Sequence, residues 1–315
     1  MIIRTAVFLS AARACMAGLV ISPAGKTPEF SLTVESVVGL SGLAWCRDDL
    51  YYAVSDKARA IVPLRVTLDQ VTGGIIAART EALVPVQTSA SDFEDIACDA
   101  TGGKVFISME QPPGIEEFTV AGQPLGPVKL PAVFLTARGN IGMECLTRNA
   151  ATGRSWTANQ DTLNADGAVS SDKAGGLVRL QEFDAAMRPL RQFAWRTELS
   201  GFRVAGSGTG VTALCLLADG QLLVMERVVA GLTLEVRIFL AGLEKATDTS
   251  SLPALDGAAF TPAQKHLLFK WPCGFTNFEG MAAGPVLKDG SRSLILVADS
   301  GKGAVHQFLA LKIAP

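Results

Sequence analysis

Acidic side chains recur at two fixed positions of a repeated sequence pattern, and they are the residues of this chain best suited to do chemistry. The first position opens a short apolar stretch in each of five copies, where the residues are Ser41, Glu94, Glu144, Thr212 and Glu279. The second position ends the β-run that follows a turn, where the residues are Asp56, Glu110, Gln160 with Asp161, Glu226 and Asp299. Seven of these acids are candidate metal ligands: Asp56, Glu94, Glu110, Glu144, Glu226, Glu279 and Asp299.

Acids gathered in this way point to a hard divalent cation. Crowded carboxylates raise one another's pKa unless a cation or a hydrogen-bond donor compensates their charge. Ca²⁺ fits this donor set best, because it takes about six to eight oxygen ligands in flexible geometry. The two histidines and the scattered thiols offer little to zinc, copper or iron. The sequence therefore predicts a Ca²⁺ site, which is weakest in the third copy, where Asn159 and Gln160 replace an acid.

The alternative is a polar, water-filled channel whose acids are paired with Arg138, Arg227 or Lys302. A phosphate-binding enzyme would likewise need Lys or Arg beside the metal to hold developing negative charge. By their positions in the repeats, the candidate substrate-binding cations are Lys57, Arg59, Arg138, Arg227 and Lys302. The sequence leaves both interpretations open.

Nucleophilic catalysis has weaker support. A serine hydrolase needs a histidine base close to its serine, and His266 and His306 both lie in strand-like runs. Residues 206–210 (Gly-Ser-Gly-Thr-Gly) place serine second, so they do not form a Gly-x-Ser-x-Gly elbow. We interpret both histidines as structural and the glycine cluster as a tight loop.

The elements that must position the acids are β-hairpins. A turn signal rich in glycine or aspartate separates the two acidic positions of each copy, as in residues 101–103 and 218–220. Third strands are predicted over residues 61–69, 115–121, 176–183, 232–240 and 304–312. Fourth strands are predicted over residues 74–84, 128–135, 190–199 and 266–272.

This repeat predicts an all-β fold, a β-propeller with five four-stranded blades. The fifth copy lacks a fourth strand, and residues 30–38 can supply it and close the ring, which removes exposed sheet edges. The longer intervals after Glu144 and Thr212 leave a sixth blade open, and residues 242–260 are predicted as an excursion outside a blade. In a propeller the innermost strands run alongside a central channel, so the acids converge on one axis.

Composition sets the class of protein. The chain has 315 residues, of which 49% are hydrophobic and 18% charged, with a net charge of −2. This balance argues against disorder and gives no field that would attract nucleic acid. No apolar run after residue 22 is long enough for a membrane helix. The six cysteines lack C-x-x-C spacing and are interpreted mainly as small buried hydrophobes.

The N-terminus is treated separately from the propeller. Residues 1–25 are predicted as a signal peptide or a disordered N-terminus, and residues 26–315 as one propeller domain. A cleaved signal would make the protein periplasmic or secreted. Arg13 is atypical so near a cleavage site.

Several motifs resemble one known family. They are residues 93–97 (Phe-Glu-Asp-Ile-Ala), 142–146 (Gly-Met-Glu-Cys-Leu), 222–227 (Leu-Leu-Val-Met-Glu-Arg), 277–285 (Asn-Phe-Glu-Gly-Met-Ala-Ala-Gly-Pro) and 289–300. Over most of residues 35–300 the chain resembles the bacterial phytase-like family, often described as "esterase-like activity of phytase". The resemblance implies a β-propeller, usually exported, with phosphoester-hydrolysing or esterase-like activity.

Two functions are therefore expected from the sequence. The first is a Ca²⁺-dependent phosphoester hydrolase, in which the metal polarises a phosphoryl oxygen and activates a water molecule. The second is a non-catalytic propeller whose acids line the channel and whose face binds a small ligand or an envelope protein. In the first case the partner is a small-molecule substrate of unspecified structure.

Overall fold

The computed structural model describes residues 18–34, 37–55, 57–202 and 204–314. Within these residues almost all regular structure is β, and no helix is long and apolar enough to span a membrane. Two short 3-10 helices, η1 (Ala132–Thr136) and η2 (Asn164–Asp166), lie in connecting segments.

Five antiparallel sheets, here called blades 1 to 5, account for the strands. Blade 1 contains β3 (Leu40–Arg47), β4 (Leu50–Ser55), β5 (Ala60–Leu68), β6 (Ile75–Thr80) and the short β7 (Val84–Pro85). Blade 2 contains β8 (Ser91–Cys98), β9 (Lys104–Gln111), β10 (Gly114–Thr119) and β11 (Pro124–Pro127). Blade 3 contains β12 (Met143–Arg148), β13 (Ser155–Asn159), β14 (Leu177–Phe183) and β15 (Pro189–Arg196). Blade 4 contains β16 (Gly208–Leu216), β17 (Leu222–Ala230), β18 (Thr233–Gly242) and β19 (Gln264–Gly274). Blade 5 contains β20 (Asn277–Val286), β21 (Arg292–Asp299) and β22 (Val305–Ala314), with β1 (Val20–Pro23) and β2 (Glu29–Thr33) at its outer edge.

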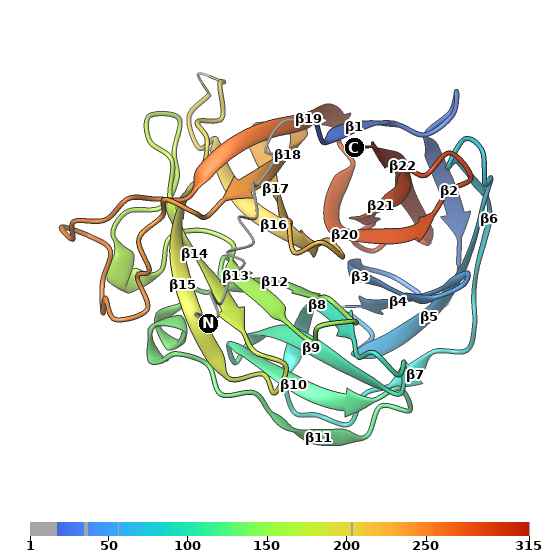
Figure 1. Cartoon of the computed structure of the whole chain (residues 1–315), viewed down its shortest axis with the longest axis horizontal. Helices are drawn as coiled ribbons and strands as arrows, with labels where there is room; N and C mark the ends of the chain where they lie inside the picture. The colour runs from blue at the N-terminus through green and yellow to red at the C-terminus, as the bar shows by residue number, and fades with distance from the viewer. Residues whose placement is uncertain (1–17, 35–36, 56, 203, 315) are drawn as a thin grey trace, which may run out of the picture.

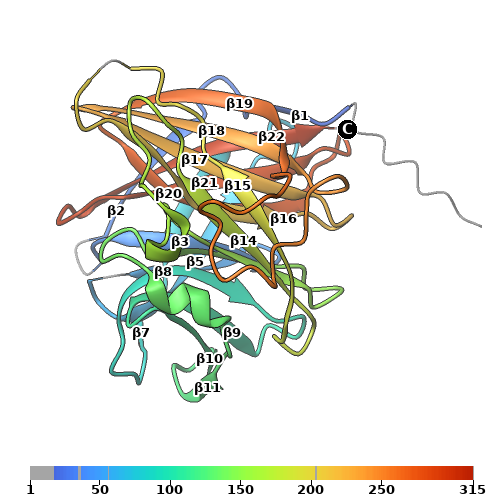
Figure 2. The same cartoon turned by 90° about the vertical axis from the view of Figure 1, so that its left-hand side faces the viewer.

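The first strand of each blade lies innermost. Figure 1 shows β3, β8, β12, β16 and β20 around a common centre, and each of them contacts the inner strand on either side. Turned by 90°, the molecule shows its blades from β19 at the top to β11 at the bottom (Figure 2). The predicted five-bladed propeller is confirmed.

Hydrophobic cores lie between neighbouring blades. In β4, Tyr51 and Ala53 pack with residues of blade 5, whereas Tyr52 and Val54 pack with residues of blade 2. Because successive strand residues point to opposite faces, a blade covered on both faces needs a continuous apolar run. Five such clusters, one at each junction, hold the described part of the ring together.

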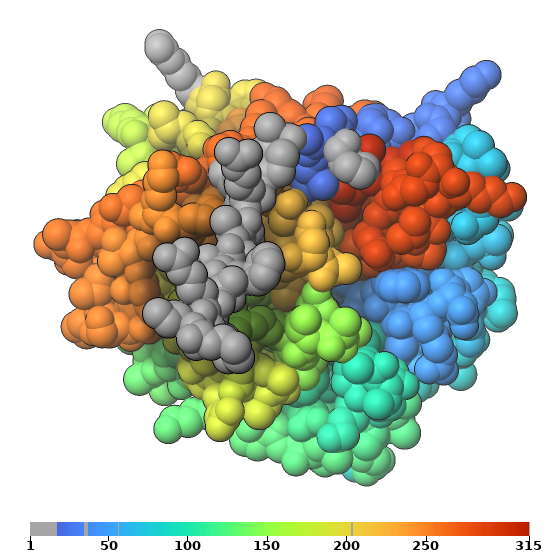
Figure 3. Space-filling view, in the orientation of Figure 1, coloured from blue at the N-terminus to red at the C-terminus, as the bar shows by residue number. Residues whose placement is uncertain are grey.

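The ring closes through the N-terminal strands. β2 pairs with β22 from Glu29↔Leu309 to Thr33↔Val305. The closing strand predicted over residues 30–38 is confirmed, but it begins at Glu29 and ends at Thr33. β1 pairs with the remainder of β22, so Val20–Pro23 are part of the propeller although residues 1–25 were assigned outside it. The space-filling view shows the red C-terminal blade against the blue N-terminal segment (Figure 3).

One predicted strand is wrong. Residues 128–135 do not form the fourth strand of blade 2, which is β11, and η1 occupies part of that range instead. Three prolines in the preceding and central part of this segment, Pro124, Pro127 and Pro131, limit its ladder to a short edge. Residues 242–260 carry no strand of their own after β18 ends, as predicted. Five cysteines, at 46, 98, 145, 215 and 273, are free thiols and Cys15 lies outside the described residues.

Candidate functional site

A β-bulge occurs near the start of every inner strand, and it coincides with the first acidic position of the repeat. In blades 2 to 5 the pairing of the inner strand with the second strand skips one residue of the inner strand. In blade 1 two residues of the inner strand lie opposite one residue of the second strand. The bulged residues are Ser41 with Gly42, Glu94, Glu144, Thr212 and Glu279. A bulge leaves its extra residue unpaired and re-aims the side chain. The first acidic position of the repeat is therefore the bulged residue of each inner strand, and the bulge directs its side chain towards the axis.

Glycine allows the inner strands to meet at this level. A Cβ on Gly42 would lie 2.4 Å from the Cα of Asp95, and a Cβ on Gly280 would lie 2.6 Å from the carbonyl oxygen of Ser41. The carboxylate of Asp95 is fully buried and accepts hydrogen bonds from the backbone N–H groups of Ile96 and Leu146. These contacts tie blades 5, 1, 2 and 3 together directly beside the bulges.

Glu94, Glu144 and Glu279 form the central acid cluster. Burial, reinforced by the charges of Glu144 and Glu279, raises the pKa of Glu94 to about 11. Burial also raises the pKa of Glu144 well above its usual range, with the charge of Glu279 adding to the effect. For Glu279, burial raises the pKa and Arg227 opposes the rise. The cluster therefore holds its full negative charge at neutral pH only beside a compensating cation.

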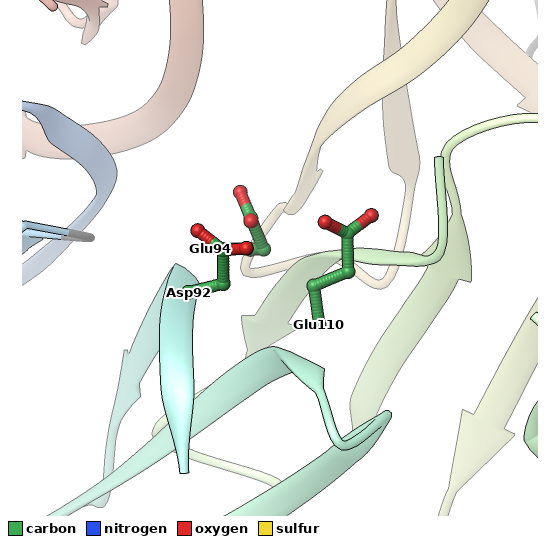
Figure 4. A group of neighbouring side chains, drawn as sticks. All are labelled: Asp92, Glu94 and Glu110. Atoms are coloured by element: carbon green, nitrogen blue, oxygen red, sulfur yellow. The ribbon is translucent and has the colours of Figure 1, made fainter. Parts of the chain in front are cut away.

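Asp92, Glu94 and Glu110 form a tighter group at the edge of this cluster. One carboxylate oxygen from each lies within 4.8 Å of the others, so the three could hold a metal ion. Figure 4 shows them rising from the ends of β8 and β9 with their carboxylates on one side. The backbone N–H of Gly142 donates to Oε1 of Glu110 over 2.6 Å and fixes it against blade 3.

Asp92 was missed when the repeat copies were compared, because the equivalent residue is not acidic in any other copy. Asp92 stands two residues before the bulged Glu94, and the residues at this position in the other copies are Gly39, Gly142, Gly210 and Asn277. Asp92 has φ of 60° and Gly39 has φ of 62°, so this column includes left-handed backbone that glycine adopts freely. The sequence offered one signal for Asp92: it precedes Glu94 by two residues.

Arg227 is the cation of the central cluster. Its Nη1 donates to Oδ1 of Asn277 over 2.6 Å and forms an ion pair with Oε1 of Glu279. Oε1 of Glu279 also accepts from Nδ2 of Asn277 over 2.9 Å. Arg227 is one of the five predicted substrate-binding cations, and it forms an ion pair with a cluster acid.

The alignment of Glu226 with Glu110 and Asp299 is wrong by one residue. Glu226 pairs with Val211 directly before the bulge, and its counterparts in blades 2 and 5 are Met109 and Ala298. Arg227 therefore occupies the column of Glu110 and Asp299. Since successive strand residues face opposite sides, this shift turns the Glu226 carboxylate away from the cluster.

Glu226 has partners between blades 3 and 4. Its carboxylate is fully buried and accepts from Nε1 of Trp195 over 2.8 Å and from the backbone N–H of Glu198 over 3.0 Å. Nζ of Lys265 completes the set at 2.6 Å. Burial raises the pKa of Glu226, and Lys265 opposes that rise.

The remaining candidates are distributed around the same end of the propeller. Asp56 lies outside the described residues. Asp299 is half-buried, accepts from the backbone N–H of Gly301 and raises the pKa of Glu279. Lys57, Arg59 and Lys302 are exposed on the turns that follow the second strands of blades 1 and 5. Arg138 donates to the carbonyl oxygens of Thr162 and Gly167, so it holds a loop of blade 3.

The two histidines, which we interpreted from the sequence as structural, lie on the fourth strand of blade 4 and the third strand of blade 5. His266 is exposed on β19, and His306 is buried on β22. Nε2 of His306 contacts the carbonyl oxygen of Val37 at 3.0 Å, and Nδ1 contacts Oγ of Ser300 at 3.3 Å. The Ser300 hydroxyl donates to the carbonyl oxygen of Gly303 over 2.8 Å.

The donor set suits a hard cation. Besides the Arg227 guanidinium, the axis carries carboxylate oxygens, and blade 4 presents the hydroxyl of Thr212 at its bulge. Thr212 is 2% exposed, and in the described part of the chain its Oγ1 has no hydrogen-bond partner. Buried hydroxyls are normally satisfied, so this oxygen is accounted for if a ligand or hydrated ion occupies the axis. Oxygen donors of this kind fit Ca²⁺, Mg²⁺ or Mn²⁺.

Comparison with known proteins gives one family. The family described as "Phytase-like: Esterase-like activity of phytase" matches residues 35–300. No curated protein matches the chain. Similar solved structures include a nidogen/laminin complex (12% identity, 89% of this chain and 88% of that chain, TM-score 0.43). Others are a streptogramin B lyase (13%, 93% and 98%, 0.38) and a luciferin-regenerating enzyme (13%, 95% and 96%, 0.40).

Proposed function

The chain belongs to the phytase-like family, and from this premise we propose that it is a phosphoester hydrolase that uses a divalent cation, Ca²⁺ by preference, on the propeller axis. The observation that carries the proposal is the convergence of three bulge glutamates and one arginine on a buried, oxygen-lined centre. A cation bound there would polarise a phosphoryl oxygen and lower the pKa of a water molecule.

The roles of the residues follow from their surroundings. Asp92, Glu94 and Glu110 would hold the cation, because their oxygens already lie within 4.8 Å of one another. Arg227 would bind a non-bridging oxygen of the substrate through its guanidinium, which is positioned by Asn277. The family description of an esterase-like activity supports an ester as substrate.

Glu144 is suited to hold a proton during the reaction. Its Oε1 accepts from Nε2 of Gln160 at 3.3 Å, and the side chain is buried beside the other acids. A cation bound beside the cluster would favour the ionised form of Glu144, and its burial would keep that carboxylate basic enough to accept a proton. We assign Glu144 the proton of the attacking water.

Cation binding is tested first. Thermal unfolding in EDTA and in millimolar Ca²⁺, Mg²⁺ or Mn²⁺ should show a higher Tm with the preferred cation, because a ligand that binds only the folded state stabilises it. The increase should be lost in Glu94→Gln. An unchanged Tm in all three cations would reject the metal site.

Hydrolysis is tested with release of phosphate from 4-nitrophenyl phosphate and from phytate. Wild type should be active with the preferred cation, and Glu94→Gln and Arg227→Gln should each lose at least about 100-fold in kcat/KM, the scale of a lost transition-state contact. Glu182→Gln is the matched control, since Glu182 is a buried glutamate paired with Arg154 and Arg191 in the outer part of blade 3. Cation binding without turnover would favour the non-catalytic, ligand-binding alternative.

A further inference from the structure

The mouth of the axial site is apolar on one side. Four side chains at this end of blade 4, here called the apolar rim, are exposed: Val204 (41%), Val229 (37%), Leu232 (78%) and Phe275 (78%). Single exposed apolar residues are ordinary, but a contiguous group beside a polar site marks a binding surface.

The ladder of blade 4 brings these residues together. Val229 pairs with Leu234, and Leu234 pairs with Gly274, so Phe275 follows the end of that ladder next to the hairpin that carries Leu232. The preceding loop reaches the same hairpin, because a Cβ on Gly231 would lie 3.8 Å from Cγ1 of Val204. The rim is therefore one surface built from a hairpin and two inter-blade connections.

The apolar rim lies next to the central acid cluster and Arg227. Val229 follows Arg227 by two residues on β17, so both face the same side and lie roughly 7 Å apart along the strand. Phe275 precedes Asn277 by two residues, and Asn277 accepts from Arg227. The wall of the site is thus charged at depth and apolar at its mouth.

We propose that the substrate is an amphiphilic ester, with an anionic head at Arg227 and the axial cation and an alkyl or aryl group against the apolar rim. This inference rests on the proposed function and specifies its substrate class. Exposed Lys57, Arg59 and Lys302 stand on blades 1 and 5 rather than on the rim, so the charged part of the mouth lies apart from its apolar part. A compact polyanion such as phytate would leave the apolar part unused.

Binding tests the proposal without requiring turnover. With Ca²⁺ present, calorimetry should show octylphosphonate, below its micelle concentration, binding at least about tenfold more tightly than ethylphosphonate, because each buried methylene adds to affinity. The double variant L232S/F275S should lose this difference and bind ethylphosphonate as wild type does. Ile76→Ser, which replaces another exposed apolar residue (62%) on β6, should keep the difference.

Turnover separates this inference from the hydrolase proposal. Ethyl phosphate and octyl phosphate have alkoxide leaving groups of similar basicity, so a lower KM for the octyl ester that L232S/F275S removes would support the rim. Equal kcat/KM for both esters would keep the hydrolase and overturn the rim. Chain-length-dependent binding without phosphate release would keep the rim and reject the hydrolase. Equal binding of both phosphonates, absence of binding, or binding only to phosphatidic acid vesicles would overturn the amphiphilic substrate.

Discussion

Arg227 determines the charge balance of the axial site. It lies among Glu94, Glu144 and Glu279. Desolvation alone would lower the pKa of Arg227, but these acids raise it above its ordinary value, and Arg227 opposes the rise in the pKa of Glu144 and of Glu279. The comparison of the repeat copies placed Glu226, rather than Arg227, in the column of Glu110 and Asp299, because Glu226 and Arg227 stand together at the end of the same apolar run. Glu226 and Arg227 are neighbours on β17, so their side chains point to opposite faces of the blade. Which of them faces the cluster depends on the position of the bulge, and strand pairing rather than residue type sets that position.

Glu226→Ala should destabilise the fold without affecting the cation site. Removing this buried carboxylate leaves the Trp195 indole N–H without its acceptor and leaves the Lys265 ammonium to the more exposed Glu198 carboxylate and the Arg196 carbonyl oxygen, which should cost about 2–5 kcal/mol in the free energy of unfolding. Urea unfolding measures that loss. The Ca²⁺-dependent increase in Tm should persist, and its disappearance would place Glu226 back among the ligands.

The bulged inner strand is the element that makes the repeat functional. The first acidic column was predictable from sequence, because all five bulges fall on the same repeated position. Asp92 was not predictable, since its column holds glycine or asparagine in the other copies. The outer strands were least predictable, as the misplaced fourth strand of blade 2 shows, because edge strands need little periodicity to pair.

Gly280→Ala should disturb the junction of blades 5 and 1. The new Cβ would lie 2.6 Å from the Ser41 carbonyl oxygen and 2.7 Å from Cγ1 of Val297, so two inner strands would have to separate. We expect a loss of about 1–3 kcal/mol in the free energy of unfolding and a weaker response to Ca²⁺. Gly139→Ala is the control, since nothing lies within 4 Å of its added Cβ. Equal stability of the two variants would contradict the close approach.

At the scale of the whole molecule, the number of blades and the manner of closure were both predictable, because each depends on counting repeats. The sequence also indicated which three copies supply the central glutamates. It did not predict β1, because four residues with mixed burial carry too little pattern to be recognised. Which acids lie closest together also required the folded ring, since Glu110 reaches blade 3 across a junction.

The stability of the whole ring should depend on pH in a direction set by the cation. Without divalent cations, the raised pKa of Glu94, Glu144 and Glu279 means that the folded state binds more protons than the unfolded state above the ordinary glutamate pKa of 4.5. Stability should then fall as pH rises from about 5 to 9 in EDTA. Ca²⁺ should remove most of this fall, so the Ca²⁺-dependent gain in Tm should be larger at pH 9 than at pH 6. A gain that shrinks with pH would contradict carboxylate ligation.

Loss of the closing strands should make the molecule associate. Deleting residues 1–34 removes β1 and β2 and exposes the outer edge of β22, which then offers unpaired backbone groups to another chain. Light scattering after size-exclusion chromatography should show oligomers or aggregates. Deleting residues 1–17 leaves both strands in place and should give the same mass per particle as the full chain.

The pairing of β2 with β22 also sets the order in which the chain can fold. The closing ladder joins two segments that all the other blades separate along the chain, so it forms with the greatest loss of chain entropy and cannot form until β22 has been synthesised. Blades 1 to 4 can assemble from local hairpins before that moment. We therefore expect a nascent, open ring whose free sheet edges are exposed to chaperones and aggregation until the ten residues of β22 emerge.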